Sequence, residues 1–559
     1  MKLNSLLFPA LLLLTTGSTA NAVTWNVTSA ADVNVAGTLR FAVNNAAAND
    51  TIKFDPGLAG QTIALSLGEL PITRNLTIVG PGPTNLAVVN ASGRVFHVLG
   101  GPLNASILGL KLTGYLKGLR GVDGSFVSRN GAAGQSVAGG CILNEVNCVL
   151  TVSNCFFANC QAIGGDGGDG YVNGIYGFTA HGGNGGDAVG AAICNNLGDL
   201  FLMNSTFAAN YAGGGHGGTG SYGGNGGRGG VAEGGGLASV YGSTDVYVVN
   251  STFNGNTAAA GDGGNAGNAW ALSLGAANGG NGGGGGNAEG GAIYVGQGCP
   301  LPDCTGIVHC TVDTNQVAPG QGQQGGSGVN GGASGAAGVN GSALGGGLFA
   351  PIVGHLPINN TIIAGNYPTF HFTTGALVIS GPDVYHDVDS FRYNFIGVLD
   401  GSSGGWIAGF DFTGTVTAPL DPLLGPLQNN GGETLTQAPL PCSPVIDKGS
   451  TALFNRDQVG QLRPKGISPS PYLADGSDIG ALELQSFSTH RPALDIAQAP
   501  NRVTISWPSS FNCFVLQQSS SIVPSNWEAV TNAVTTSASR CQVVISPLVG
   551  NRFYRLFHP

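Results

Sequence analysis

Three aspartates in a glycine-rich stretch have the spacing of a calcium site. Residues 164–172 and 182–190 both fit the nonapeptide Gly-Gly-x-Gly-x-Asp-x-apolar-x, which binds Ca²⁺ in parallel β-rolls. Ca²⁺ prefers carboxylate and carbonyl oxygens, so the candidate ligands are Asp166, Asp169 and Asp187. The residues between the two nonapeptides break the pattern, and glycine-rich sequence matches it by chance. We therefore predict no resident metal and no cofactor, with Ca²⁺ kept as the alternative.

The remaining polar clusters indicate structure rather than chemistry. The densest one consists of Asp383, His386, Asp387, Asp389 and Arg392. It runs directly into a Tyr-Asn-Phe-Ile-Gly motif, and we interpret the whole segment as structural. Further along the chain, four acidic residues are expected to cap turns, as Asp does through its side-chain oxygens: Asp421, Asp447, Asp457 and Asp478.

The repeated part of the chain lacks the residue patterns of a polysaccharide enzyme. A glycosidase needs paired carboxylates about 5–10 Å apart, and a lyase needs a base beside a carboxylate-held metal. The charges that stand out in the repeats are single ones, namely Asp245, Asp303 and Asp313. We therefore predict no catalytic residues and no enzyme. A polysaccharide lyase or glycoside hydrolase remains the alternative.

The elements that hold these residues repeat five times. Each copy begins with a Gly-rich tetrad that ends in an aliphatic residue; the tetrads start at Gly139, Gly190, Gly234, Gly290 and Gly345. Each copy then has an apolar residue three positions before an asparagine; these are Asn159, Asn210, Asn256, Asn315 and Asn366. The interval within a copy is nearly constant, at about 17–22 residues, whereas the interval between copies varies and is rich in glycine. Short units of this kind cannot bury an apolar face alone and must stack. The pattern predicts an all-β, right-handed parallel β-helix.

Two expectations follow from this stacking. The asparagines should lie one above another at turns, in left-handed backbone, with each amide bonded to its copy in the next coil. The glycine-rich excursions should leave the β-helix on one side, and we hypothesise that they form a second layer of extended glycine strands. The excursions considered are 164–190, 213–233, 261–289 and 319–344.

The Gly-rich tetrad and the apolar residue three positions before an asparagine resemble the Gly-Gly-Ala-Ile and Phe-x-x-Asn repeats of chlamydial polymorphic membrane proteins and related bacterial surface proteins. That resemblance implies a β-helix surface protein. Residues 413–485 resemble the choice-of-anchor Q domain, through motifs such as Asn429 to Gly432 and Asp478 to Glu483. This second likeness implies a secreted or surface protein and no chemistry.

The chain is therefore expected to have five parts. Residues 1–22 read as a secretory signal peptide, with an apolar run and a small-x-small cleavage site. Residues 23–114 hold short strands and one helix, with Thr38 as its N-cap, at the open end of the β-helix. Residues 115–412 form the repeats, and 413–485 close them. Residues 493–559 alternate apolar and polar residues around Trp507 and Trp527, which predicts a small β-sandwich resembling the terminal modules of exported proteins of Verrucomicrobia-like bacteria.

The composition of the chain limits the kinds of partner that it is expected to bind. Only 9% of the residues are charged, 98 of 559 are glycine and the net charge is −10, which argues against nucleic acid as a partner. Cys155 and Cys310 share a repeat position with serines and are expected inside the coils. Two disulfide pairings are left open: Cys299 with Cys304, and Cys513 with Cys541.

Together these features predict a non-catalytic, exported or cell-surface β-helix protein with a structural or adhesive role. It should be a monomer that contacts surface proteins or glycans. After signal cleavage no transmembrane segment is expected.

Overall fold

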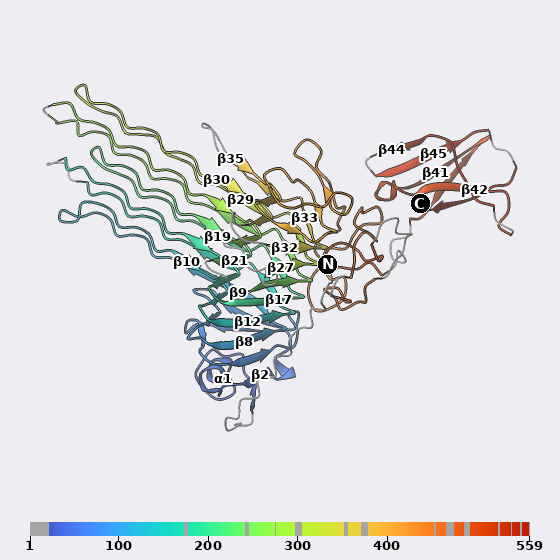
Figure 1. Ribbon diagram of the computed structural model, residues 1–559, viewed down its shortest axis with the longest axis horizontal. Coiled ribbons are helices and arrows are strands. Elements are labelled where there is room, and N and C mark those ends of the chain that lie inside the picture. Colours follow the sequence, from blue (N-terminus) through green and yellow to red (C-terminus); the bar gives the residue numbers. More distant parts are fainter. Residues whose placement is uncertain are drawn as a thin grey trace.

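The protein is built on a parallel β-helix, which confirms the predicted fold class. The structure is a computed structural model that describes residues 22–559 except 173–176, 241–244, 274, 297–304, 351–355, 370–377, 452–453, 465–473, 486–491, 524–525, 538, 548–549 and 558–559. Figure 1 shows the stacked coils rising from α1 and β2, a set of long extended segments projecting to one side, and a small terminal module at the far end. The predicted signal peptide lies outside the described residues.

Three parallel sheets form the walls of the β-helix. The first contains β1 (Thr24–Val27), β2 (Asp50–Phe54), β5 (Leu76–Val79), β8 (Leu103–Leu108), β12 (Cys148–Ser153), β17 (Asp199–Met203), β22 (Val246–Val249), β27 (Thr305–Val308), β32 (Pro357–Asn359) and β37 (Asp389–Ser390). The second contains β4 (Leu70–Ile72), β7 (Phe96–Val98), β11 (Ile142–Asn144), β16 (Ile193–Asn196), β21 (Leu237–Val240), β26 (Ile293–Val295), β31 (Leu348–Phe349) and β36 (Val384–Tyr385).

The third sheet bends partway round the coil and so has two strands in each repeat. The first run comprises β3 (Gln61–Leu65), β6 (Leu86–Asn90), β9 (Lys111–Lys117), β13 (Phe156–Ala158), β18 (Thr206–Ala208), β23 (Thr252–Asn254), β28 (Thr311–Asp313), β33 (Ile362–Ala364), β38 (Phe395–Ile396) and β39 (Phe412–Thr413). The second comprises β14 (Gln161–Ile163), β19 (Tyr211–Gly213), β24 (Thr257–Ala259), β29 (Gln316–Ala318) and β34 (Tyr367–Pro368).

A six-stranded sheet joins the projecting segments to the β-helix. It contains β10 (Val137–Ala138), β15 (Ala188–Val189), β20 (Ala232–Glu233), β25 (Ala288–Glu289), β30 (Ser342–Leu344) and β35 (Val378–Ser380). The Gly-rich tetrad follows directly. Its first glycine has φ of 62–65° in all five copies, a left-handed conformation that glycine adopts without strain. The tetrad therefore marks the corner between this sheet and the second wall.

Like side chains stack above like in the core. The aliphatic residues that end the five tetrads pair in register from β11 to β31. On the third sheet Phe157, Phe207 and Phe253 are fully buried, and their ring centroids are 4.5 Å apart from coil to coil. The coils therefore share one continuous apolar interior, as stacked units must.

The asparagines bond from coil to coil as predicted. The prediction of left-handed backbone for the bonded asparagines is wrong, and so is the choice of Asn159 as the first residue of the row. Amides donate along the row at 2.7–2.8 Å, from Asn210 to Asn256, Asn315, Asn366 and finally the carboxylate of Asp383. None of these four asparagines has positive φ; the left-handed residue is the one before, such as Ala209. The strand register aligns Asn159 with Ala209, so Asn159 is the exposed left-handed residue and Cys160 takes the inner place.

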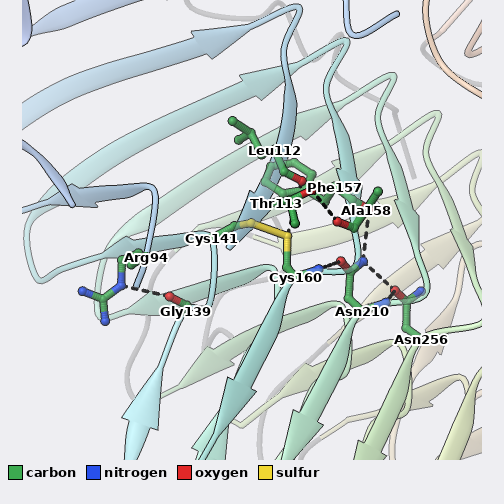
Figure 2. Close-up of a disulfide and its surroundings, with 10 residues drawn as sticks. All are labelled: Arg94, Leu112, Thr113, Gly139, Cys141, Phe157, Ala158, Cys160, Asn210 and Asn256. Carbon is green, nitrogen blue, oxygen red and sulfur yellow. Dashed lines mark hydrogen bonds between the residues drawn. A yellow bond between two sulfur atoms is a disulfide. The ribbon is translucent and has the colours of Figure 1, made fainter. Parts of the chain in front are cut away.

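Several cysteines line the inside of the coils, as predicted. Cys155 and Cys310 are fully buried free thiols, and the Cys155 amide donates to Ser205 Oγ at 3.1 Å. Cys160 forms a disulfide with Cys141, and its amide donates to Asn210 Oδ1 at 2.8 Å (Figure 2). This disulfide thus ties the tetrad corner to the head of the asparagine row.

The predicted helix at the open end is present. Helix α1 (Leu39–Asn45) has Thr38 as its N-cap, which accepts from the Phe41 amide. Leu39, Ala42 and Val43 are buried in the main core, so the helix seals the apolar interior below β2. A short 3₁₀ turn, η1 (Pro56–Leu58), follows.

The described residues of 420–484, which exclude 452–453 and 465–473, form an irregular strap across the outer face of the third sheet. The Gln458 side chain accepts from Thr252 Oγ1 of β23 and donates to Thr206 Oγ1 of β18, while the Thr434 hydroxyl donates to the Asn204 carbonyl just before β18. The Arg463 guanidinium is buried against Glu483 at 3.3 Å. Three of the four predicted carboxylates accept from backbone amides: Leu423 donates to Asp421, Gln461 to Asp457, and the Asp447 amide to Asp478. For the Asp447 carboxylate, turn capping stays a prediction. The strap is therefore held by polar contacts as well as by a small apolar cluster.

The terminal module is a β-sandwich of two antiparallel sheets. Its strands are β40 (Asp495–Ala499), β41 (Arg502–Pro508), β44 (Val534–Thr536) and β45 (Arg540–Ile545) in one sheet, and β42 (Val515–Ser519), β43 (Glu528–Ala529) and β46 (Phe553–Phe557) in the other, with a 3₁₀ turn η2 (Ser509–Phe511). Trp507 is buried as predicted, whereas Trp527 is half-exposed beneath the Arg555 guanidinium.

The disulfide of this module differs from the one considered. Cys513 pairs with Cys442 of the strap, which leaves Cys541 as a buried free thiol. The other pairing considered, Cys299 with Cys304, lies outside the described residues.

Candidate functional site: the glycine-rich blade and its tip

The described residues of five glycine-rich excursions form one ordered body, which we call the blade; they belong to 118–137, 164–172 with 177–188, 213–232, 260–273 with 275–288, and 319–342. Each excursion runs out from the third sheet and returns into the six-stranded sheet. In Figure 1 the excursions lie side by side as extended segments that leave the β-helix in one direction. The hypothesis of a second, extended glycine layer is thus correct for the described residues.

The excursions pair with their own copies at every third residue. In the third excursion Gly214, Gly217 and Gly220 donate to the carbonyls of Ala259, Asp262 and Asn265 in the next one, at 2.8–2.9 Å. A repeat of three residues per turn without internal hydrogen bonds is the geometry of the polyproline II helix. The outgoing segments therefore make one layer of parallel three-fold helices, and the returning segments make another in the same way.

The two layers are joined by a second set of bonds. Gly215 and Gly218 donate across the blade to Gly186 and Gly183, at 2.9 and 2.8 Å, and Gly227 donates back to the Gly218 carbonyl at 2.9 Å. These partners run in opposite directions, so the layers are antiparallel to one another. Two of every three amides are thereby satisfied within the blade.

The third residue of each triplet faces outward, and its amide is capped by a side chain. The amides of His216 and Thr219 donate to the carboxylates of Asp166 and Asp169 one coil away, at 2.8 and 2.7 Å. On the returning layer the Arg228 amide donates to Asn184 Oδ1 at 2.9 Å. The excess of Asp and Asn at this position follows, because a short side chain with an acceptor completes the hydrogen bonding of the neighbouring helix.

The two inward positions require glycine. A Cβ on Gly227 would lie 1.9 Å from the Gly183 carbonyl oxygen, and one on Gly215 would lie 2.0 Å from that of Gly165. No side chain fits at such distances, so the glycine content of the chain is a packing requirement of the blade.

The structure does not gather the three candidate calcium ligands. Asp166 and Asp169 face outward from an outgoing helix, while Asp187 lies on the returning layer and accepts from the Val231 amide at 2.8 Å. Asp169 also pairs with Arg120 at 2.9 Å. Within the described part of the chain no three His, Cys, Asp or Glu side chains are grouped as a metal site. These aspartates instead cap the backbone, and the nonapeptide match follows from the glycine triplets.

The blade ends in a cluster of aromatic side chains, which we call the tip. Phe126 meets Tyr171 and Phe178 edge-on, with ring centroids 6.4 and 6.1 Å apart, and Tyr222 meets Trp270 at 6.4 Å. Phe126 is 58% exposed. The tip also contains exposed Val127, Val172 and Leu272, together with Arg129, whose guanidinium lies 4.1 Å from the Phe178 ring. Exposed apolar groups gathered in this way mark interaction sites.

The cluster around Asp383 lies at the end of the β-helix. Asp383 is buried, accepts from Asn366 and from the Val398 amide, and closes the asparagine row. Burial raises the pKa of this carboxyl to about 7. His386 packs against Tyr385, Asp387 accepts from Ser403, and Arg392 lies over the Phe410 ring at 4.3 Å. Each of these four residues bonds or packs within the chain.

Sequence reasoning missed two acidic residues and one excursion. Glu233 and Glu289 occupy the same position just before their tetrads and pair in register on β20 and β25. Burial first, and then Glu289 and Asp187, raise the pKa of Glu233 to about 7. The repeated Ala-Glu-Gly-Gly was the available signal. The excursion at 118–137 was missed because, at the edge of the blade, it has fewer glycines than the others.

Comparisons with known proteins give little beyond this geometry. No protein-family model and no curated protein sequence matches the chain. Among solved structures, a mannuronic acid-specific polysaccharide family 6 lyase from human gut microbiota aligns over 69% of this chain and 92% of its own, with 12% identity and a TM-score of 0.16. A family 6 alginate lyase aligns over 81% of this chain and 60% of its own, with 10% identity and a TM-score of 0.15. Scores this low carry no argument.

Among the described residues no helix is long and apolar enough to span a bilayer.

Proposed function

We propose that this is an exported, non-catalytic protein of the cell surface that adheres to a surface protein or glycan through the tip of its blade. The observation that carries the proposal is the tip itself, where aromatic side chains gather at the outer end of an ordered blade. Aromatic residues supply large contact area with little conformational entropy to lose and dominate binding sites.

The construction of the blade supports this role. Its amides are bonded within a layer, across layers and to outward side chains, so the tip is held by a stiff body rather than by a flexible loop. A rigid site loses less entropy on binding than a mobile one. The β-helix then serves as the support that sets five excursions in register.

Binding of the purified mature chain, residues 23–559, to a glycan array and to intact bacterial cells tests the proposal. Phe126→Ser removes an exposed tip ring, and Val122→Ser alters a side chain on the flank of the blade that is also exposed (77% against 58% for Phe126). We expect Phe126→Ser to weaken binding by at least tenfold, the scale of an interface hot spot, while Val122→Ser binds as the natural chain does. Melting temperatures of both variants should be unchanged.

If the protein is instead a polysaccharide enzyme, the same purified chain and variants should show a different result. A lyase or hydrolase would release unsaturated or reducing sugar ends from a panel of acidic and neutral polysaccharides. Product release that survives Phe126→Ser, or equal loss of binding in both variants, would overturn the adhesive role of the tip.

A further inference from the structure

An open pocket lies where the blade joins the β-helix, away from the tip. It has a volume of roughly 260 Å³ and opens at the corner between the six-stranded sheet and the second wall. Val189 and Glu233 line it from the blade side, on β15 and β20. Leu143, Cys194 and Val240 line it from the wall side, on β11, β16 and β21.

The floor of the pocket is apolar. Leu143, Cys194 and Val240 belong to one small hydrophobic cluster, against which Val189 packs. Burial raises the pKa of the Cys194 thiol to about 12, so this sulfur is neutral and adds to the apolar surface rather than acting as a nucleophile. A ligand would therefore place hydrocarbon against this floor.

Two carboxyl groups border the floor. Glu145 accepts from Asn196 Nδ2 at 2.8 Å, and its other oxygen lies 3.3 Å from His97 Nε2. Glu233 is bonded by the Tyr294 hydroxyl. Both glutamates keep oxygen lone pairs for a further donor, because a carboxylate accepts about four hydrogen bonds.

The surroundings carry an excess of negative charge. Glu289 and Asp187 act on Glu233 from the neighbouring strands. Among the described residues at this corner, Arg94 supplies a positive charge, but it is already engaged by Glu69 at 2.5 Å and by the carbonyls of Gly139 and Ala138 at 2.9 and 2.6 Å. The unbalanced charge favours a cationic ligand, since a positive group is drawn to clustered carboxylates in a partly desolvated site.

We propose that this pocket binds a primary alkylammonium group, with its hydrocarbon chain on the floor of Leu143, Val189 and Val240 and its nitrogen donating to Glu145 and Glu233. The ligand class covers free polyamines and lysine side chains of a partner. An ammonium has three donors and no acceptor, which suits carboxylates that border an apolar floor and accept hydrogen bonds.

Binding is coupled to a proton. Glu233, whose pKa lies near 7 through burial and the nearby Glu289 and Asp187, must ionise to pair with the ammonium. The ligand itself stays charged below about pH 9, because an alkylamine has a pKa close to that of lysine, about 10.4. The ionised fraction of Glu233 rises from about one-eleventh at pH 6 to about ten-elevenths at pH 8, so affinity should rise about tenfold.

Titration calorimetry with n-hexylamine on the full mature chain tests the proposal, with hexanol and hexanoate as neutral and anionic probes. We expect hexylamine to bind about tenfold more tightly at pH 8 than at pH 6, and hexanol and hexanoate to bind at least tenfold more weakly. Cadaverine and Nα-acetyl-lysine amide then separate a free amine from a protein-borne one.

The matched variants are Glu233→Gln and Glu289→Gln. Glu289 is likewise half-buried, one strand further along, and it lies outside the pocket lining. Glu233→Gln should weaken hexylamine binding at least tenfold at pH 8 and remove the pH dependence, whereas Glu289→Gln, which removes only a charge from outside the pocket, should weaken it by less than about fivefold. Equal affinity for hexanol, affinity independent of pH in the natural chain, or no binding at millimolar hexylamine would overturn the proposal. The pH comparison needs no variant and decides the matter if Glu233→Gln fails to fold.

Discussion

Gly227→Ala is the sharpest perturbation of the blade. The added Cβ would lie 1.9 Å from the Gly183 carbonyl oxygen, and real contacts of this kind are not found below 3.0 Å. The two layers must therefore part locally by about 1.1 Å, which is the difference between the two distances. Three bonds cross or flank this point: Gly227 to Gly218, Gly218 to Gly183, and Gly264 to Gly227, at 2.8–2.9 Å.

The energetic estimate follows from these bonds. A buried polar group that loses its partner costs about 1–3 kcal/mol, so weakening three bonds should destabilise the blade by about 4 kcal/mol. The gain of about 0.4–1 kcal/mol from a less flexible unfolded chain is too small to reverse the sign. Exchange protection in the blade should therefore fall several hundredfold, since 1.4 kcal/mol corresponds to a factor of about ten.

Hydrogen exchange read by mass spectrometry is the appropriate assay, because the blade can open without unfolding the β-helix. Peptides covering 177–188 and 213–232 should exchange faster in Gly227→Ala, while peptides of the core strands do not change. Arg228→Ala is the matched control, because its side chain is exposed and faces outward; it should shift stability by less than about 0.5 kcal/mol. Equal protection in the two variants would refute the tight packing of the layers.

Three further predictions concern stability of the natural chain. Glu233→Gln should stabilise the protein by up to about 3 kcal/mol at pH 8 and not at pH 4.5. The pKa of Glu233 in the folded chain is raised from 4.5 to about 7, so the natural chain loses stability as pH rises through that window. Urea melts that give identical pH profiles for the variant and the natural chain would contradict this. Asn256→Leu should cost about 4 kcal/mol, because it leaves buried groups of Asn210 and Asn315 without partners; Asn254→Ala, on the half-exposed neighbouring side, is its control in the same melts. Arg463→Met should lower the free energy of unfolding by roughly 3–5 kcal/mol, because it leaves the buried Glu483 carboxylate without its guanidinium partner. If the double variant Arg463→Met with Glu483→Gln recovers part of this loss, that part is due to the unpaired charge rather than to packing.

The repeats determine how much of this structure could be predicted from the sequence. The tetrads and the apolar marks predict the parallel β-helix because one glycine at a left-handed corner and one buried side chain recur in every coil. Asn159 shows the limit of such sequence motifs, because it aligns with Ala209 rather than with Asn210. An asparagine can serve either at the left-handed turn or as an amide in the buried row, and spacing alone does not distinguish these two roles.

The blade was foreseen only as a hypothesis, for a physical reason. Glycine repeats of this kind are usually flexible, and they become ordered here only because the β-helix holds five of them in register. The three-residue period of Gly-Gly-Asp or Gly-Gly-Asn contains the signal, since it assigns two amides to neighbouring helices and the third to a side chain. The pocket at the blade root could not be predicted, because Glu145 and Glu233 are far apart in sequence and line one pocket only through the stacking of coils.

Footprinting of the protein bound to the surface or glycan that it recognises tests the adhesive role most directly. Hydroxyl-radical oxidation reports solvent access at Phe126 and Trp270 in the tip and at Val146, an exposed side chain of the β-helix (47% exposed). The proposed role predicts that binding protects Phe126 and Trp270 and leaves Val146 unchanged. Tip residues that oxidise equally in the free and bound protein, or protection confined to the β-helix, would contradict it.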